Sequence, residues 1–377
     1  MRIALIDPTS STPPYDHALA AALARRGHDV HLLTSGFRFG ALPPAVGFRR
    51  DELLFPLTEL LFARAPRSRL RFAARGVDYI PNAVRLLRRV RSLEPDAVHV
   101  QWLPLPRSDI VWLRALARAW PTLFTAHNIF PSRSRDLRSW GKALGIVDTV
   151  VVHSRSGADA LAQFGADVGR IEVVTHPVFP PISPRTTVAR DESMLLFFGL
   201  IRARKGLDVL IRALPRIVEA VPTARLVVAG DPIDSVEPLR ELAATLGVAS
   251  KIEWRLAFLP ENEIAGWMCR ASLVVLPYSR GASSGVLATA LGYGRPVVVS
   301  DVGSLGEIVR DFHAGRIIAP HDERSVASAC AELLADPRAW SDAAAGAEEA
   351  ARVLTWDAAA EAHERAYAEA IETRKLR

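Results

Sequence analysis

Two basic side chains share a short loop that follows an apolar strand. The strand Met194–Phe198 leads into Gly199, and Arg202 and Lys205 then precede Gly206. Cations at a helix start can neutralise the charge that grows on a departing diphosphate, and they need no metal ion to do so. The alternative is an Arg/Lys pair on the surface of an amphipathic helix, but the glycines that bracket the loop favour the phosphate interpretation.

A second loop is built of small residues and hydroxyls. It runs from Pro277 through Ser283, Ser284, Gly285 and Val286 into a short predicted helix. Exposed N–H groups and the positive end of such a helix hold phosphates in α/β proteins. Together the two loops predict a clamp for a diphosphate, with cations on one side and backbone amides on the other.

Polar residues also follow the predicted strands of the N-terminal half. His127 comes after the strand Thr122–Thr125, so it is expected at a carboxyl end, where site residues gather. Its neutral imidazole can orient a substrate hydroxyl. In the alternative interpretation it caps the strand and bonds to backbone. A core role is favoured for four further residues: His99, Gln101, Trp102 and His153.

Length and composition limit the class of protein. A chain of 377 residues with 49% apolar and 23% charged residues predicts a globular enzyme of two domains. The two cysteines, Cys269 and Cys330, form no disulfide framework and lack metal-ligand spacing, so a reducing cytoplasm is expected. Met1–Asp7 indicates a first strand rather than a signal peptide, and no apolar run reaches the roughly 18–20 residues of a membrane span.

The basic excess lies in the N-terminal half. Nine arginines between Arg64 and Arg91 are interleaved with leucines and phenylalanines. Such a stretch suits an anionic membrane surface or another polyanionic partner, and the alternative is a solvated helical face. It has few aromatic residues for base stacking, so no nucleic-acid partner is expected.

Short apolar strands alternate with helical patterns in both halves, which is typical of βαβ units and parallel sheets. The predicted strands are Ile3–Ile6, Val30–Leu33, Ala97–Val100, Thr122–Thr125 and Thr149–Val152, then Met194–Phe198, Ala224–Ala229, Lys251–Ala257, Ser272–Leu276, Pro296–Ser300 and Gly315–Ile318. The proline-rich stretch Pro177–Arg190 separates the two series. The prediction is an α/β chain with two Rossmann-like, doubly wound domains, residues 1–178 and 179–355, that face each other across a cleft.

The alanine-rich tail Ala343–Ala370 favours helix. Trp356, Ala360, His363 and Tyr367 recur at helical spacing. Residues 356–377 are therefore expected to form a C-terminal helix that packs back on the body of the protein. His363 is expected at the edge of the stripe, with its ring tip in water.

The order and spacing of these motifs resemble the family-4 retaining glycosyltransferases, whose two-Rossmann architecture is called GT-B. The resemblance covers nearly the whole chain. It is carried by Gly27-His28-Asp29-Val30, Thr125-Ala126-His127-Asn128, Phe198-Gly199 through Lys205-Gly206, Ala229-Gly230-Asp231, and Pro277 through Glu307. It implies that residues 1–178 form the acceptor side and residues 179–355 bind a nucleotide sugar.

The resemblance also implies roles for single residues. Arg202 and Lys205 would bind the diphosphate of the nucleotide sugar, and His127 would lie beside the reacting sugar. The nucleotide-sugar side would further include Gly199, Gly230, Ser283, Ser284, Gly285, Val286 and Glu307. Glu307 could meet ribose or sugar hydroxyls, and a carboxylate that stabilises its helix dipole is an equal alternative.

The chain departs from the family in two loops. The family's usual glutamates, which reach the donor sugar and the ribose, would stand at Gly281 and Thr289, and neither carboxylate is present. A branch of the family has this Ser-Gly-Val loop, so activity is still expected although the donor is not identified. The loop Thr9–Pro14, before Asp16 and His17, lacks the family's paired glycines and is assigned to the acceptor side.

The leading hypothesis is a retaining glycosyltransferase that moves a sugar from a nucleoside-diphosphate sugar to an acceptor hydroxyl in polysaccharide or glycolipid synthesis. The expected acceptor is a sugar or lipid-linked sugar, and the expected location is the cytoplasm, with an anionic membrane surface as a further partner through Arg64–Arg91. No cofactor or metal is expected, because the ten histidines lack ligand spacing. The alternatives are a nucleotide-sugar epimerase of the same fold and a degenerate, non-catalytic transferase homologue.

Overall fold

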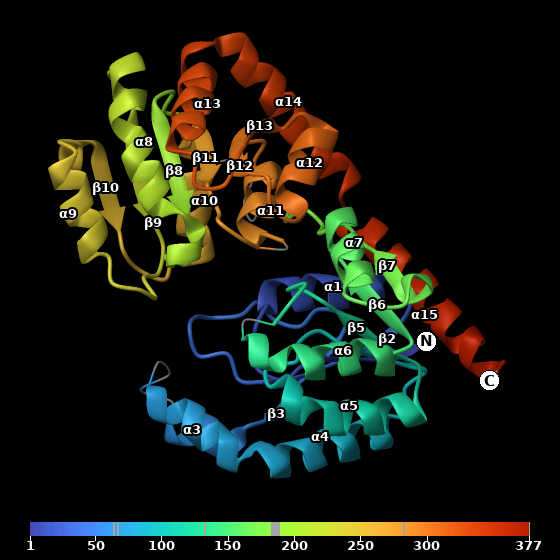
Figure 1. Cartoon of the computed structure of the whole chain (residues 1–377). Coiled ribbons are helices and arrows are strands. Elements are labelled where there is room, and N and C mark those ends of the chain that lie inside the picture. The colour runs from blue at the N-terminus through green and yellow to red at the C-terminus, as the bar shows by residue number, and fades with distance from the viewer. Residues whose placement is uncertain (63–64, 66–67, 132, 182–188, 282, 377) are drawn as a thin grey trace. The chain divides into compact units, whose positions relative to one another are not determined.

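The computed structural model of the chain divides into two compact units (Figure 1). Unit 1 comprises residues 1–175 and 356–377, and unit 2 comprises residues 176–355. The structure describes residues 1–62, 65, 68–131, 133–181, 189–281 and 283–376. Arg64 and Arg67 of the basic stretch and residues 182–188 of the predicted linker therefore lie outside the described residues.

Unit 1 contains a parallel sheet that, within the described residues, has seven strands in the order β3-β2-β1-β4-β5-β6-β7. Its strands are β1 (Arg2–Asp7), β2 (Asp29–Ser35), β3 (Arg49–Leu54), β4 (Ala97–Val100), β5 (Thr122–Thr125), β6 (Thr149–Val152) and β7 (Ile171–Val173). Its helices are α1 (Pro13–Arg25), α2 (Pro56–Leu61), α3 (Arg69–Val77), α4 (Tyr79–Leu93), α5 (Pro106–Ala119), α6 (Leu137–Ile146), α7 (Arg155–Gln163) and α15 (Trp356–Lys375). The strand order reverses at β1, which lies between β2 and β4.

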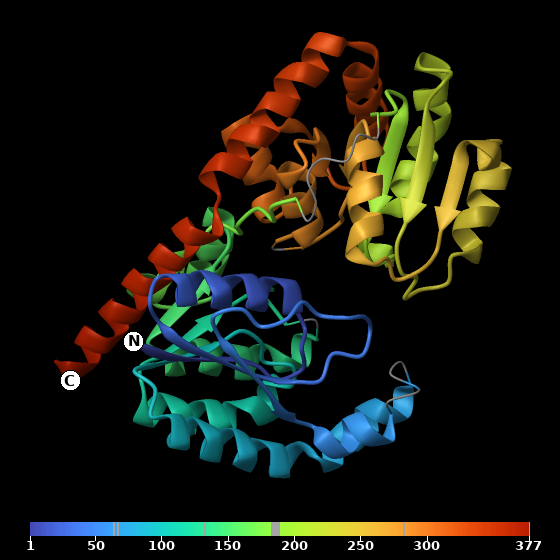
Figure 2. The same cartoon turned by 180° about the vertical axis from the view of Figure 1, so that it is seen from behind.

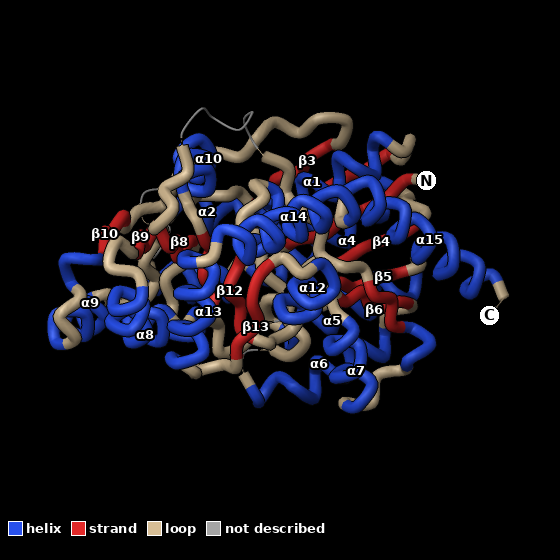
Figure 3. Tube along the Cα trace, turned by 90° about the horizontal axis from the view of Figure 1, so that it is seen from above, coloured by secondary structure: helices blue, strands red, loops and turns tan. Residues whose placement is uncertain are grey.

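Unit 2 repeats this plan with a parallel sheet of six described strands in the order β10-β9-β8-β11-β12-β13. Its strands are β8 (Met194–Phe198), β9 (Arg225–Ala229), β10 (Ile252–Arg255), β11 (Leu273–Leu276), β12 (Val297–Ser300) and β13 (Gly315–Ile318). Its helices are α8 (Leu207–Ala220), α9 (Glu237–Thr245), α10 (Glu261–Arg270), α11 (Gly285–Gly292), α12 (Ser304–Phe312), α13 (Glu323–Ala335) and α14 (Pro337–Val353). Helices lie on both sides of the strands in each unit (Figure 3). The predicted α/β fold with two doubly wound parallel sheets is confirmed.

The apolar strands follow from this layering, because a strand covered on both faces must bury alternate side chains on both sides. In β8, Leu195 and Phe197 pack in a cluster with α8 and α13. Met194 and Leu196 point the other way, into a cluster with α10, α11 and α12. The run of apolar residues that indicated this strand therefore serves two separate cores.

Several predicted strands match the structure residue for residue, namely Ala97–Val100, Thr122–Thr125, Thr149–Val152, Met194–Phe198 and Gly315–Ile318. The sequence pattern misses β3 and β7, which are the two edge strands of the sheet in unit 1. β3 is mostly polar and only its last residue, Leu54, is fully buried, while β7 has three residues. An edge strand can keep one side in water, so it does not require the continuous apolar run on which the prediction depends.

The two ends of unit 2 lie side by side. The backbone N–H of Val178 donates to the carbonyl of Leu354 at 2.7 Å. The alanine-rich tail is divided here, since α14 ends at Val353 and α15 begins at Trp356. From Trp356 the chain rejoins unit 1, where α15 packs beside α1 (Figure 2).

The prediction for His363 is wrong. Its ring is fully buried rather than tipped into water, with Nδ1 at 2.7 Å from the carbonyl oxygen of Ala359. The rings of His99 and His363 lie 5.3 Å apart, and the Tyr367 hydroxyl lies 2.8 Å from His99 Nδ1. Helix α15 therefore packs the ring of His363 against His99 of the buried strand β4, and this face of the helix is not in contact with solvent at His363.

Burial lowers the pKa of His363 to about 4. Because this value lies below that of an unfolded histidine, the unfolded chain binds the proton first as the pH falls, and the stability present above pH 6.5 is lost towards pH 4. We expect wild-type protein to lose about 2–3 kcal/mol more unfolding free energy between pH 6.5 and 4.5 than His363→Leu does. Urea unfolding followed by tryptophan fluorescence measures this difference.

The matched control is His321→Asn, which removes an exposed histidine. Its stability should follow the wild-type pH dependence. Parallel pH curves for wild type and His363→Leu would contradict the burial argument.

Candidate functional site

In unit 2 the strand order reverses between β8 and β11, which are neighbours in the sheet. Loops at such a reversal leave a crevice at the carboxyl ends of the strands, where α/β proteins bind ligands. The loop after β8 carries Arg202 and Lys205, and the loop after β11 carries Ser283 and Ser284. Topology thus brings the two predicted halves of the diphosphate clamp to one edge of one sheet.

Close backbone approaches hold the loop after β8 in place. A Cβ added at Gly230 (φ +152°) would lie 1.9 Å from the carbonyl oxygen of Gly199. A Cβ added at Gly199 (φ +106°) would lie 3.0 Å from Cγ2 of Val286, the second residue of α11. These two glycines therefore have a packing role that needs no ligand, and they bring the cationic loop against the helix of the small-residue loop.

The loops after β8 and β11 are also joined directly. Gly206 adopts φ +68°, and a Cβ there would lie 1.9 Å from the carbonyl oxygen of Pro277. The backbone N–H and hydroxyl of Ser279 both donate to the carbonyl of Arg204, at 3.0 and 3.2 Å. The short helical turn Ala203–Lys205 is thereby fixed against the residues that follow β11.

A chain of side-chain contacts connects Lys205 to the start of α11. The Lys205 ammonium lies 3.6 Å from the ring centroid of Tyr278, a buried residue. The Tyr278 hydroxyl lies 3.4 Å from Oγ of Ser284, and Ser284 caps α11 by accepting from the N–H of Leu287. Lys205 and Ser284, predicted on opposite sides of the clamp, therefore contact the same tyrosine.

A carboxylate contacts the backbone of this loop rather than its cations, since Asp234 accepts from the N–H of Ala203 at 2.9 Å. Within the described chain, no ion pair forms to Arg202, Arg204 or Lys205, and the buried Nε of Arg202 has no hydrogen-bond partner. Burial, then the charge of Arg202, lowers the pKa of Arg204, a residue that sequence reasoning did not select. Partly buried like charges without a counter-charge are costly, so this arrangement favours binding of an anion.

The remaining predicted residues of unit 2 lie at the same sheet edge. Gly285 is exposed at the start of α11, and Ser283 is half-buried just before it. Glu307 is half-buried in the first turn of α12, after a neighbouring strand. At the positions of the missing glutamates, Thr289 donates its hydroxyl to the carbonyl of Gly285, whereas a Cβ at Gly281 would meet nothing within 4 Å.

Unit 1 has its own reversal, between β2 and β4 on either side of β1, and polar residues gather there. The indole of Trp102, after β4, stacks on His127, after β5, with ring centroids 5.0 Å apart. Trp102 also donates its N–H to the hydroxyl of Thr12 at 2.8 Å, which joins the loop after β1 to this group. Tyr15 meets His127 edge-on at 4.8 Å. Trp102, for which the sequence favours a core role, thus lies against His127.

The hydrogen bonds around His127 determine its tautomer. His153 Nδ1 lies 2.8 Å from the carbonyl oxygen of Val174, so this nitrogen donates. Burial lowers the pKa of His153 to about 4, so the ring is neutral and its Nε2 accepts from His127 Nδ1 at 3.2 Å. His127 Nε2 lies 3.0 Å from Oε1 of Gln101. Because this oxygen can only accept, the contact is a hydrogen bond when Nε2 carries a proton, or when the Gln101 amide is turned so that its otherwise unpartnered NH2 group donates to a neutral ring.

The loop after β1 is held by carboxylate contacts rather than by glycines. Asp7 is fully buried and accepts from the backbone N–H groups of Thr9, Ser11 and Thr12 at 3.2, 2.5 and 3.2 Å. Asp16 is buried beside it, and burial together with the charge of Asp7 raises the pKa of Asp16. The pair therefore fixes the loop that the family usually builds with two glycines.

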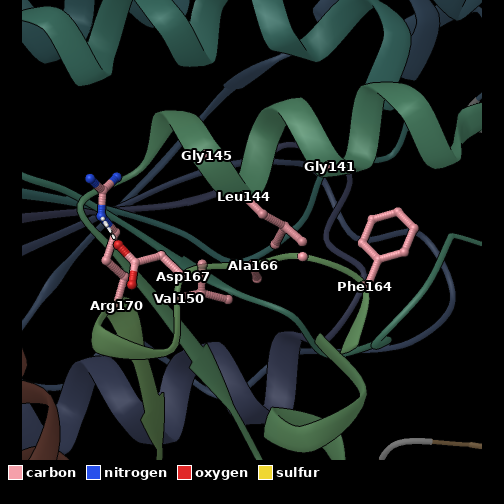
Figure 4. A pocket seen from close by; sticks show the side chains of 9 residues that line it. Gly141, Leu144, Gly145, Val150, Phe164, Ala166, Asp167 and Arg170 are labelled. Atoms are coloured by element: carbon pink, nitrogen blue, oxygen red, sulfur yellow. Dashed lines mark ion pairs between the residues drawn. The ribbon is translucent and has the colours of Figure 1, made fainter. Parts of the chain in front are cut away.

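A separate pocket of about 220 Å³ lies in unit 1 between α6 and the turn after α7 (Figure 4). Its walls include Leu144, Val150 and Phe164, and an ion pair of 3.3 Å between Arg170 and Asp167 borders it. None of the predicted site residues lines it. The pocket is therefore not part of the chemistry that the motifs predict.

Two searches concern only the part of the chain that the structure describes. In that part, no three His, Cys, Asp or Glu side chains are grouped so that they could hold a metal ion. No helix there is long and apolar enough to cross a bilayer.

Known proteins are similar to this chain over most of its length. The family profile for Glycosyltransferase Family 4 matches residues 15–179, and the profile for Glycosyl transferases group 1 matches residues 192–336. A D-inositol 3-phosphate glycosyltransferase 2 of Catenulispora acidiphila is 30% identical over 94% of this chain and 88% of its own. The chain belongs to glycosyltransferase family 4.

A second relative supports the same assignment. The D-inositol 3-phosphate glycosyltransferase of Xylanimonas cellulosilytica is 29% identical over 95% of this chain and 91% of its own. This family-4 chain is accordingly an enzyme of the hexosyltransferase class.

Solved structures show the same fold. A sucrose-phosphate synthase of Thermosynechococcus elongatus matches 99% of this chain and 100% of its own, with a TM-score of 0.77 and 19% identity. The Anabaena protein Alr3699/HepE, solved with UDP and glucose, matches 98% of this glycosyltransferase and 100% of its own chain, with a TM-score of 0.73 and 16% identity. The predicted GT-B fold is confirmed.

The close approach of Gly206 to Pro277 can be tested against a glycine with the same backbone conformation. Alanine at Gly206 (φ +68°) or at Gly247 (φ +70°) is destabilised by about 1–2 kcal/mol because of the left-handed backbone conformation. Only at position 206 would the new methyl group also collide with backbone atoms. We expect Gly206→Ala to cost about 1–3 kcal/mol more than Gly247→Ala, in which the new methyl group finds open space. Thermal unfolding measures both, and equal losses would contradict the packing argument.

Proposed function

We propose that this glycosyltransferase transfers a sugar from a nucleoside-diphosphate sugar to an acceptor hydroxyl with retention of configuration, in glycolipid or polysaccharide synthesis. The observation that carries the proposal is the uncompensated positive charge of Arg202 and Lys205, fixed against the N-terminus of α11. Such a group binds a diphosphate and stabilises the charge that it gains as it leaves.

In this proposal unit 2 holds the donor. Arg202 and Lys205 meet the diphosphate from one side, while the backbone N–H groups of Gly285 and Val286 meet it from the other. Glu307 reaches hydroxyls of the ribose or sugar. Support for a uridine donor comes from structural neighbours, since Alr3699/HepE was solved with UDP and with UDP-glucose.

His127 is proposed to contact a sugar hydroxyl. Its Nδ1–H is engaged by His153, so a sugar hydroxyl would meet Nε2, in exchange for the contact that this nitrogen makes with the side-chain amide of Gln101. The stacked Trp102 offers an apolar ring face next to it, a surface against which sugars pack. Relatives named D-inositol 3-phosphate glycosyltransferase support a polar, hydroxyl-rich acceptor.

The proposed chemistry requires no nucleophile from the protein. The acceptor hydroxyl attacks the anomeric carbon from the face that the diphosphate leaves, and the departing phosphate oxygen takes the hydroxyl proton. The new glycosidic bond then has the donor's configuration. Lys205 and Arg202 assist because their charge opposes the negative charge that grows on the leaving group. No metal ion is needed in this scheme, which stays a prediction.

We further infer that the enzyme works at the inner face of an anionic membrane, through the surface of α2, α3 and α4. Apolar side chains stand out from it, with Leu60, Leu61, Leu70 and Ile80 each more than two-thirds exposed. Several arginines of the stretch are not available to lipid, since Arg71 and Arg75 pair with the buried Glu59 and Arg89 pairs with Asp51. Exposed leucines together with the exposed Arg88 and Arg91 support docking on lipid headgroups.

The function is tested first with nucleotides and then with products. Thermal shift with the diphosphates of uridine, guanosine, adenosine and thymidine should identify one that stabilises the protein by binding. Incubation of the matching α-linked nucleotide sugar with inositol 3-phosphate and with simple sugar acceptors should give an α-linked product by nuclear magnetic resonance. A β-linked product would contradict retention, epimerised donor in the absence of acceptor would favour the epimerase, and no nucleotide binding would favour a non-catalytic homologue.

Membrane docking is tested by sedimentation with vesicles of phosphatidylcholine containing about 30% phosphatidylglycerol, an anionic surface. Replacing Arg88 and Arg91 by Gln should weaken binding up to about 30-fold at low salt, since each cation contributes about 1 kcal/mol near the surface. Leu60→Asn with Leu61→Asn should weaken it as well.

The matched control for docking is Val111→Asn on α5, where the side chain is as exposed as those of the two leucines. It should leave vesicle binding unchanged. If wild-type protein stays in the supernatant with and without anionic lipid, this surface is only a solvated face.

A further inference from the structure

Lys205 is held in place by an aromatic ring rather than by a carboxylate. Its ammonium lies 3.6 Å from the centroid of the Tyr278 ring, over the ring face. Tyr278 is 1% exposed and belongs to the core cluster that includes Leu276 and Leu287, so the ring itself has little freedom to move. The ring is thus a rigid platform, and the lysine is the flexible partner.

A ring face and a carboxylate fix a lysine with different consequences. The electron-rich face attracts the ammonium through its quadrupole and leaves the net charge of the cation in place. A carboxylate would cancel that charge and occupy an N–H donor with a strong hydrogen bond. Within the described chain, Lys205 has no ion pair. The ammonium can therefore turn its donors and its full charge towards a phosphate.

The other end of the tyrosine fixes the ring's orientation. Its hydroxyl lies 3.4 Å from Oγ of Ser284, which is 6% exposed and caps α11. Pro277, the residue before Tyr278, is covered by Gly206, the residue after Lys205. The lysine and the tyrosine are consequently held by backbone contacts on their neighbours as well as by their own side chains.

We propose that Tyr278 is a positioning residue for Lys205. The face of the Tyr278 ring holds the lysine ammonium at the place where the donor's diphosphate binds. This inference rests on the proposed function, because it needs Lys205 to meet the diphosphate. It assigns to the tyrosine a role that its burial alone does not require, since phenylalanine would fill the same space. The ring is the acting part, and the hydroxyl serves only to orient it.

The experiment is a double-mutant cycle on the dissociation constant of UDP, measured by titration calorimetry with the full chain. Lys205→Gln should weaken UDP binding about 10- to 100-fold, as expected for loss of a charge-assisted contact. Tyr278→Leu should weaken it about 5- to 30-fold, and Tyr278→Phe should stay close to wild type because the ring face remains. In the Lys205→Gln background, Tyr278→Leu should change UDP binding less than about threefold, since the two residues act as one unit.

A second set of variants tests the same role if Tyr278→Leu does not fold. In this set, phenylalanines with increasing ring fluorination replace Tyr278. These rings keep the shape of the side chain while they withdraw electron density from its face, so UDP affinity should fall stepwise along the series. Circular dichroism checks that each variant is folded. A flat series, or a Tyr278→Leu effect that is equal in both backgrounds, would overturn the positioning role.

The outcomes separate the two proposals. Normal UDP affinity in Lys205→Gln, or no binding of any of the four nucleoside diphosphates by wild type, would overturn the proposed donor site and with it the role of Tyr278. If Lys205→Gln weakens UDP binding but shows no coupling to Tyr278, the proposed donor site is kept and only the positioning role of Tyr278 is overturned.

Discussion

The cationic loop of unit 2 depends on two places where backbone passes against backbone with no room for a Cβ atom. Gly206 meets the carbonyl of Pro277, and Gly230 meets the carbonyl of Gly199. Because these contacts fix three loops at the reversal of the strand order, the cations need no ion pairs to hold them. The loop is rigid by steric contact, and its charge is left for a ligand.

In unit 1 the loop after β1 is held by hydrogen bonds to a carboxylate rather than by close backbone contacts at glycines. Its loop after β1 has no paired glycines, and the buried carboxylate of Asp7 gathers three backbone N–H groups instead. Next to it, a relay of hydrogen bonds runs from the carbonyl of Val174 through His153 to His127 and sets which nitrogen of His127 carries the proton. Buried polar groups that are hydrogen-bonded to one another in this way favour one arrangement of a site over others.

Much of this could be predicted from the sequence, for reasons visible in particular residues. Strands covered on both faces, such as Met194–Phe198, must be apolar throughout and so can be recognised directly. The positions of Arg202, Lys205 and Ser284 follow from the rule that loops at carboxyl ends converge. Edge strand β3 escapes prediction because it is mostly polar and is paired only in the folded chain, whereas the start of the C-terminal helix at Trp356 is predicted from the helical spacing.

Other features of the site required side-chain geometry. Helical spacing predicts that the C-terminal helix packs on the body of the protein, but not how deep His363 lies, because its burial depends on the ring of His99 beside it. The pairing of Arg71 and Arg75 with Glu59 converts part of a basic sequence into a buried ion cluster, which a count of charges cannot show. Likewise Tyr278 looks like a core tyrosine until the position of the Lys205 ammonium over its ring is known.

The hydrogen bond between Val178 and Leu354 has a consequence for how such enzymes diversify. Because the two segments that enter and leave unit 2 are hydrogen-bonded to each other, unit 2 is inserted into unit 1 through two adjacent joints. Recombination at these joints would exchange one complete sheet with its helices and leave the hydrogen bonds of the other sheet intact. Under the proposed function, such an exchange would replace the donor site in unit 2 and keep the acceptor site in unit 1, and the first and last helical segments of unit 1 would stay undisturbed.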